Sequence, residues 1–489
     1  MDSKFKNPGT GLLSDLLGLL ALALAYRLCF WAAMPRVLDT ADAIHYLEAA
    51  KHFVQGDFWG YDPKIPPLYP ALTALLFPVT HDLELSAMWV SFLASSLAVA
   101  PLYLLARDLH GRSAAQIAGV ALAIWPWMAD YGCRVGNESL ALLGWLLGVW
   151  FFSRAVRLGG WRVWLAPLPF FALHLTRAEG LVVWMAAPIG AMLLGRSAGT
   201  PFWRRVLVFT ALSLGLVIAN ACYVRELTGQ VTANYRIHFI MEEFDYLRFM
   251  DTAYKTLFDV FPVMLGPVLL VFFGAGLFRP PSDGDSRDTR LELYTLLFAT
   301  VQTGASWFVL SPAPRYLMAP IAVLATWSAA GIVSTAQHAG GGGFGRLLRH
   351  LPATALVASM LCGTAVTLGA EHLGRRPREP REYKVAGQWM REHLPPALIF
   401  TCKPQVGYYA DMPSTGPAPE DTLDDALRRA REAGAQYVVT DERYATAGLR
   451  PLLNPEAAPQ SLRLLYDSTP FPQSRIIVYE LEESPAVKP

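Results

Sequence analysis

The sequence predicts a polytopic α-helical membrane protein that carries a small α/β domain at its C-terminal end. Of the 489 residues, 53% are hydrophobic and only 17% are charged, whereas a soluble domain carries about 25% charged residues. About eleven segments are apolar over roughly the 19 residues that hydropathy windows use to detect membrane spans. From about residue 371 the chain turns charged and proline-rich. We therefore expect residues 1–370 to form a transmembrane domain, with the external loops 34–84 and 225–259 on its active-site face, and residues 371–489 to form a water-soluble domain.

The apolar segments give the predicted spans in chain order. They lie near residues 11–33, 85–106, 113–130, 139–153, 163–176, 180–195, 206–224, 260–278, 291–310, 317–335 and 351–369. The first segment follows two lysines, as a signal peptide does, but it lacks a small-residue cleavage site. We expect it to be kept as the first transmembrane helix.

The loops between the predicted spans indicate the orientation in the membrane. If the N-terminus is cytoplasmic, every second junction returns to the cytoplasm, and these junctions hold the clusters of arginine, in agreement with the positive-inside rule. The clustered residues are Arg107, Arg112, Arg154, Arg157, Arg162, Arg196, Arg204, Arg205, Arg279, Arg287, Arg290, Arg346 and Arg349. An odd number of spans then places the C-terminal domain, and the long loops 34–84 and 225–259, outside a cytoplasmic (inner) membrane.

The C-terminal region has the alternating pattern of a small α/β domain. We expect helices at 383–394 and 422–433 and strands at 398–402, 436–440 and 475–481. Thr422 stands where a helix cap is preferred, Asp425 occupies the capping-box position, and Gly434 follows the end of the helix.

The first external loop contains an amphipathic helix that is too short and too polar to span the membrane. Residues 39–56 place apolar side chains at helical spacing, and the opposite face carries Asp42 and Glu48. Such a helix is expected to lie flat at the membrane surface. Two interpretations of its acids stay open. Asp39 can cap the helix while the helix dipole favours Asp42, or the acids can serve chemistry at the membrane boundary.

Several runs resemble the GT-C superfamily of lipid-phosphosugar-dependent glycosyltransferases, in particular the protein-mannosyltransferase-like and aminoarabinose-transferase-like enzymes of the family 39/83 type. These runs are D-A-I-H-Y-L-E-A-A from Asp42, K-I-P-P-L-Y-P from Lys64, Y-L-L-A-R-D-L-H-G-R-S-A-A-Q-I-A-G from Tyr103, R-V-G-N-E-S-L-A-L from Arg134, T-R-A-E-G from Thr176 and P-R-Y-L-M-A-P from Pro314. The resemblance covers the membrane part and implies a GT-C-like fold. It implies transfer of a sugar from a polyprenyl phosphate to a lipid, polysaccharide or protein of the envelope, with inversion.

The resemblance also assigns candidate catalytic residues. Asp42 matches the first-loop acid that acts as the base, which an acceptor hydroxyl needs because its pKa lies far above neutrality. Glu138 stands where relatives carry a second acid that orients the acceptor or assists a metal; it can equally just begin the next helix. Some relatives use a divalent cation and others do not, and the sequence shows no metal-binding motif, so the metal stays unknown.

Candidate substrate-binding residues are the basic and aromatic groups suited to a lipid phosphate, together with one further acid. They are Asp39, Lys64, Tyr69, Arg177, Arg315 and Tyr316. Arginines at external ends of spans are costly near lipid and tend to be paired or functional. For Arg177, a structural ion pair with Glu179 is the competing interpretation. The expected partners are the polyprenyl-phosphate sugar donor, the acceptor and membrane lipids.

Other classes of function fit less well. The formal net charge of +1 argues against a nucleic-acid partner, because phosphate-binding surfaces show an excess of lysine and arginine. A polytopic transporter or lipid flippase is the main alternative, but it should show inverted repeats and polar groups within the spans. A membrane-anchored scaffold whose soluble domain carries the function is the third.

Overall fold

The computed structural model describes residues 11–195, 199–229, 245–279, 288–309, 312–339, 343–372, 381–468 and 474–482. The chain divides into two compact units. One comprises residues 1–33 and 47–367, and the other comprises residues 34–46 and 368–489. The division falls inside a helix of the first loop, α2 (Ala41–Val54), so the segment that carries Asp39 and Asp42 groups with the C-terminal domain.

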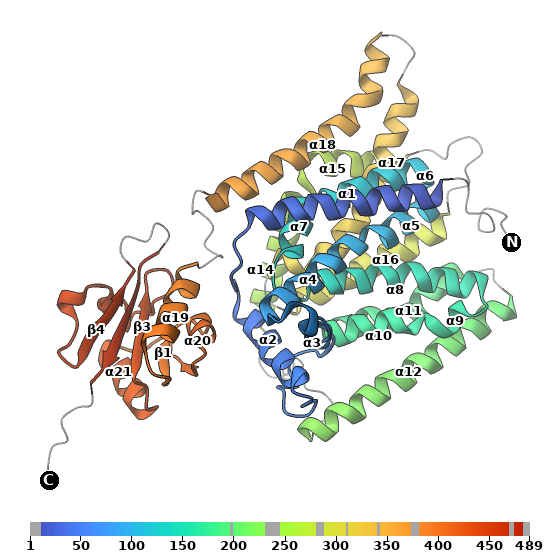
Figure 1. Cartoon of the computed structure of the whole chain (residues 1–489). Helices are drawn as coiled ribbons and strands as arrows, with labels where there is room; N and C mark the ends of the chain where they lie inside the picture. The colour runs from blue at the N-terminus through green and yellow to red at the C-terminus, as the bar shows by residue number, and fades with distance from the viewer. Residues whose placement is uncertain are drawn as a thin grey trace. The chain divides into compact units, whose positions relative to one another are not determined.

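The membrane unit is a bundle of helices (Figure 1). Its first half contains α1 (Leu12–Ala33), α3 (Leu68–Thr80), α4 (Leu83–Leu97), α5 (Val99–His110), α6 (Arg112–Ala123), α7 (Pro126–Gly132), α8 (Glu138–Leu158), α9 (Arg162–Leu165), α10 (Pro167–Thr176) and α11 (Gly180–Leu194). Its second half contains α12 (Thr200–Thr228), α14 (Tyr246–Lys255), η2 (Thr256–Val260), α15 (Phe261–Leu277), α16 (Thr289–Trp307), η3 (Pro314–Tyr316), α17 (Met318–His338) and α18 (Gly343–His372).

Each predicted span coincides with one of these helices or with two that follow each other directly. Among the described residues, seven helical segments are long and apolar enough to cross a membrane, and α3 and α11 are shorter apolar helices. The chain is thus a multi-pass membrane protein. The long loop expected at 225–259 is partly helical, because α12 continues to Thr228 and α14 begins at Tyr246.

The spans differ in how much of their surface the bundle covers. In α17, 78% of the apolar segment is buried, whereas in α12 only 17% is. The uncovered side chains of α12 include Leu207, Leu214 and Ile218, and exposed apolar surface of this kind is stable only against lipid. The span α17 is therefore central, and α12 is peripheral.

Small residues let α15 and α17 pack at very short range. A Cβ atom added at Gly276 would lie 1.8 Å from the carbonyl oxygen of Trp327, and one added at Gly331 would lie 2.1 Å from that of Phe272. Glycine is required at both positions, as at other close contacts between membrane helices.

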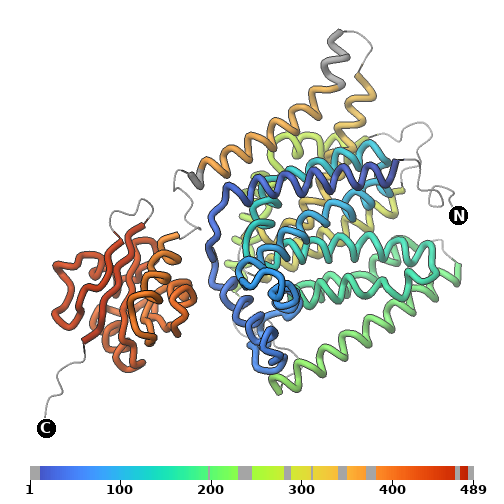
Figure 2. Tube along the Cα trace, viewed as in Figure 1, coloured from blue at the N-terminus to red at the C-terminus, as the bar shows by residue number. Residues whose placement is uncertain are grey.

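An aromatic core fixes the helices that later form the site. The rings of Phe152 on α8 and Phe209 on α12 lie 4.3 Å apart, and those of Tyr294 and Phe298 on α16 lie 4.9 Å apart. Phe170 on α10 stacks on Phe298 at 6.0 Å. The helix α16 is distant in sequence from α8 and α10 but packs against both in the bundle (Figure 2), so the ends of these helices are held in fixed relative positions.

The C-terminal domain is a five-stranded mixed sheet with strand order β2-β1-β3-β5-β4. Its strands are β1 (Ile399–Thr401), β2 (Ser414–Thr415), β3 (Tyr437–Asp441), β4 (Leu462–Asp467) and β5 (Ile476–Leu481). Its helices are α19 (Arg381–His393), α20 (Gln405–Ala410) and α21 (Leu423–Glu432), with short 3-10 turns η4 (Arg450–Leu453) and η5 (Pro455–Ala457). Strand β1 pairs parallel with β2 and β3, and β5 pairs antiparallel with β3 and β4.

Alternate strand residues pack on the two faces of this sheet. Val438 faces α21 in one buried cluster, whereas Tyr437 and Val439 pack with α19 and α20 in another. The five elements predicted here are present, and Thr422 caps α21 by accepting a hydrogen bond from the N–H of Asp425 over 3.3 Å. Gly434 has φ of 75°, as the position after a helix requires.

Candidate functional site

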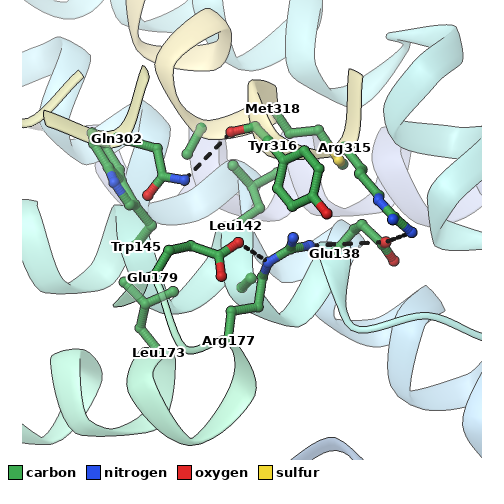
Figure 3. A pocket seen from close by; sticks show the side chains of 12 residues that line it. Glu138, Leu142, Trp145, Leu173, Arg177, Glu179, Gln302, Arg315, Tyr316 and Met318 are labelled. Atoms are coloured by element: carbon green, nitrogen blue, oxygen red, sulfur yellow. Dashed lines mark hydrogen bonds and ion pairs between the residues drawn. The ribbon is translucent and has the colours of Figure 1, made fainter. Parts of the chain in front are cut away.

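The candidate site is a pocket at one end of the bundle, where the ends of three sequence-distant segments meet (Figure 3). The N-terminus of α8 supplies Glu138, the turn between α10 and α11 supplies Arg177 and Glu179, and η3 supplies Arg315 and Tyr316. The pocket has about 330 Å³ of empty volume, which includes its opening to solvent. Its other lining residues are Ala141, Leu142, Trp145, Leu173, Gln302, Met318 and Ala319. The lining therefore combines charged side chains with apolar ones.

Two arginines share one carboxylate in this pocket. Nη1 of Arg177 lies 3.9 Å from Oε1 of Glu138, and Nη1 of Arg315 lies 4.0 Å from the same oxygen. Each of the two guanidinium groups also lies over the ring of Tyr316, at 4.6 Å from its centroid for Arg177 and 5.2 Å for Arg315. The carboxylate and the ring face offset the repulsion between the two cations. A phosphate group could do the same, because guanidinium binds carboxylate and phosphate in similar geometry.

The two arginines are held to different degrees. Arg177 donates from Nε to Glu179 Oε1 over 2.6 Å and from Nη1 to Asn137 Oδ1 over 3.4 Å. Its side chain is 11% exposed, whereas that of Arg315 is 27% exposed. The ion pair of Arg177 with Glu179 is present as the competing sequence interpretation expected. Arg315, with more solvent access and longer contact to Glu138, is the better placed of the two to meet a ligand.

A second set of contacts fixes the loop that leads to Glu138. Asn137 donates from Nδ2 to the carbonyl oxygen of Thr176 over 2.7 Å, which ties the start of α8 to the end of α10. The backbone N–H of Gly136 donates to the hydroxyl of Tyr69 over 3.0 Å, and Ser91 Oγ donates to the carbonyl oxygen of Gly136 over 2.9 Å. Both backbone polar groups of the buried residue Gly136 are thus satisfied by side chains.

Tyr69 itself is fully buried, and its hydroxyl also donates to the carbonyl oxygen of Ala87 over 2.8 Å. Its predicted role in substrate binding stays a prediction; the hydroxyl is engaged by protein groups, and Tyr69 is not among the residues that line the pocket. Asn137 and Ser91 were not predicted as supports, nor Gln302 as a lining residue. Gln302 lies within a predicted span, where a polar side chain is itself a signal of function.

The remaining expected residues are not among those that line the pocket. Lys64 is exposed in the turn before α3, where its N–H donates to Asp62 Oδ1 over 3.0 Å. Asp42 is exposed in the first turn of α2, and Asp39 is half-buried two residues before that helix. Thr40 Oγ1 caps the helix by accepting a hydrogen bond from the N–H of Ala43 over 3.3 Å.

The part of the chain that the structure describes contains no evident metal site. No three histidine, cysteine, aspartate or glutamate side chains come together there closely enough to hold an ion. The pocket offers two carboxylates, but both face arginines, which is a poor donor set for a divalent cation.

The comparisons with known proteins agree with this architecture. The family model described as dolichyl-phosphate-mannose-protein mannosyltransferase matches residues 64–223, which include Tyr69, Glu138 and Arg177. The chain is therefore similar to this family over that segment. No curated protein matches the sequence.

Several solved structures share the fold. ArnT from Cupriavidus metallidurans, bound to undecaprenyl phosphate, has a TM-score of 0.60 and 16% identity, over 94% of this chain and 98% of that one. The oligosaccharyltransferase of Archaeoglobus fulgidus in its apo form has a TM-score of 0.62 and 13% identity, over 88% and 69%. The mycobacterial arabinofuranosyltransferase AftD has a TM-score of 0.52 and 14% identity, over 95% and 41%. A complex of the oligosaccharyltransferase contains zinc and sulfate.

Proposed function

We propose that this chain is a GT-C glycosyltransferase that transfers a sugar from a polyprenyl monophosphate to a hydroxyl or amine of an envelope molecule. The observation that carries the proposal is the pair of guanidinium groups, Arg177 and Arg315, that meet on Glu138 in a pocket also lined by apolar side chains. A lipid phosphate needs this combination, because its headgroup is anionic and its first prenyl units are apolar. The structure of ArnT with undecaprenyl phosphate bound supports the same donor class here.

The chemistry follows from the donor. The acceptor oxygen or nitrogen attacks C1 of the sugar, the new glycosidic bond forms on the opposite face, and the bond between C1 and the phosphate oxygen breaks. The lipid phosphate leaves with an additional negative charge. The more exposed Arg315 stabilises this charge most directly, and the more buried Arg177 adds a second positive charge beside it. The proton of the acceptor passes to Asp42, whose role rests on its match to the first-loop acid of the family. Inversion at C1 follows from this single displacement.

Orientation belongs to the same proposal. The arginine-rich junctions face the cytoplasm, the N-terminus is cytoplasmic, and the pocket and the C-terminal domain face outward, with about eleven spans in all. A reporter fused after Pro489 should then be active in the external compartment, and cytoplasmic activity of that fusion would contradict the topology.

Binding of undecaprenyl phosphate to the purified full-length protein tests the donor site. Replacing Arg315 by Gln removes a charged hydrogen-bond donor, worth about 1.5–3 kcal/mol, and should weaken binding about 10- to 100-fold. The control is Arg162→Gln, since the guanidinium of Arg162 lies over Trp161 and is not part of the pocket lining. If the Arg315→Gln and wild-type proteins bind undecaprenyl phosphate with equal affinity, the pocket is not the donor site.

A further inference from the structure

We propose that the C-terminal domain acts as a positioning device for the acidic segment of the first loop, through Tyr409 on α20 and Lys384 on α19. The inference deepens the proposed function and rests on it, because it gives the soluble domain a task in the same reaction. Tyr409 and Lys384 are positioning residues, since each contacts the backbone that precedes Asp39 and Asp42.

Two hydrogen bonds join the domain to this segment. The buried N–H of Leu38 donates to the hydroxyl of Tyr409 over 2.7 Å. The ammonium group of Lys384 donates to the carbonyl oxygen of Arg36 over 2.7 Å. Residues 35–39 form neither helix nor strand, so their backbone groups have no partners within a regular element. A backbone group that is buried without a partner destabilises the fold. For the N–H of Leu38, the domain supplies this partner through the hydroxyl of Tyr409.

The two side chains are themselves held in place. Lys384 Nζ lies 5.0 Å from the ring centroid of Tyr409, so the cation and the ring support each other. The helices that carry them pack tightly, because a Cβ atom added at Gly387 on α19 would lie 2.6 Å from Cβ of Tyr409. The contact with residues 36–38 therefore comes from a rigid part of the domain rather than from a mobile side chain.

The position of the contact in the chain gives it a consequence for chemistry. Asp39 follows Leu38 directly, Thr40 caps α2, and Asp42 lies in the first turn of that helix. Fixing the backbone at residues 36–38 therefore fixes where α2 begins and limits the positions that the Asp42 carboxylate can reach. Small displacements of a general base can lower a rate by about 100-fold, so a domain without catalytic groups of its own can still set the rate.

Hydrogen–deuterium exchange of the full-length protein tests the contact directly. Tyr409→Phe removes the acceptor of the Leu38 N–H, and Lys384→Met removes the donor to Arg36. Both variants should exchange faster than wild type in peptides that cover residues 36–46. Matched controls in the same domain are Tyr479→Phe, whose hydroxyl donates to the carbonyl oxygen of Leu452, and Lys403→Met, whose ammonium lies over Tyr444. The controls should leave exchange at residues 36–46 unchanged.

Two further readouts separate positioning from a merely structural role. Affinity for undecaprenyl phosphate should be that of wild type in Tyr409→Phe, because the proposed donor site lies in the membrane unit. Sugar added to the envelope, measured by mass spectrometry at equal expression, should fall about tenfold. Unchanged exchange at residues 36–46 overturns the inference, and so does faster exchange with undiminished sugar transfer. A wild-type chain that adds no sugar overturns the proposed function itself, and with it the task assigned to this contact.

Discussion

The hydroxyl of Tyr69 accepts a hydrogen bond from the backbone N–H of Gly136 over 3.0 Å, two residues before Glu138. Ser91 lies 2.9 Å from the same hydroxyl and donates to the carbonyl oxygen of Gly136. The peptide that leads into α8 is therefore held from both sides. Through it, a tyrosine of α3 fixes the carboxylate that faces Arg177 and Arg315.

Replacing Tyr69 by Phe should weaken binding of undecaprenyl phosphate about 5- to 10-fold. The change leaves the buried N–H of Gly136 without its acceptor, at a cost of about 1–3 kcal/mol, and the loop shifts to recover a partner. The control is Tyr103→Phe, which removes the hydroxyl of another buried tyrosine, one that donates to Asp15. Wild-type affinity in Tyr69→Phe, or an equal loss in Tyr103→Phe, would show that the Gly136 contact does not support the pocket.

Arg177 should prove to be both structural and functional. Replacing it by Met leaves Glu138 and Glu179 largely buried without their shared cation, which typically costs about 3–5 kcal/mol, so the midpoint of thermal unfolding should fall clearly. The double change Arg177→Met with Glu179→Gln should recover much of that midpoint, because one stranded charge is removed.

Binding of undecaprenyl phosphate separates the two roles of Arg177. The double variant should still bind more weakly than wild type, since the second cation of the pocket is absent. Full recovery of both stability and affinity would mean that Arg177 serves only the ion pair with Glu179.

The C-terminal domain should depend on pH through Glu382. Burial raises the pKa of this carboxyl, and the guanidinium of Arg443, 3.2 Å away, offsets only part of that effect. A carboxyl with a raised pKa contributes stability at pH values below its unfolded pKa of about 4. That contribution is lost as the pH rises through the folded pKa. Glu382→Gln should therefore gain stability relative to wild type between about pH 4 and pH 7.

Calorimetry of the full-length variants across this pH range measures the effect. Asp421→Asn should instead lose stability relative to wild type at neutral pH. Hydrogen bonds from Arg429 lower the pKa of Asp421, so the stability that this carboxylate contributes is lost as the pH falls. If the difference in unfolding midpoint between Glu382→Gln and wild type does not change with pH, burial does not control this carboxyl.

Much of the architecture is readable from the sequence because its signals are local. Each span is a continuous apolar run, and the two ends of α21 follow from Thr422 and Gly434. Strand β4 was missed because Arg463 breaks its apolar pattern, and β2 was missed because it comprises only Ser414 and Thr415. Short strands of this kind depend on their neighbours in the sheet rather than on their own residues.

The candidate site was only partly predictable for a related reason. Glu138, Arg177 and Arg315 could each be singled out as charged residues at the ends of spans. That both arginines approach the same carboxylate oxygen of Glu138 depends on how α8, α10 and α16 pack. This packing cannot be read from any local sequence pattern. The role of Tyr69 was hidden for the same reason, because its partner Gly136 is 67 residues away and contributes only backbone atoms.

Mass spectrometry of the cell envelope tests the central claim most directly. Cells that produce this chain should carry an envelope lipid, glycan or protein that is heavier by one sugar than in cells without it. Cells that produce Asp42→Asn at the same level should lack that increment, because the acceptor keeps its proton. Identical envelopes with and without the chain would contradict glycosyl transfer, and an undiminished increment in Asp42→Asn would contradict the assignment of its base.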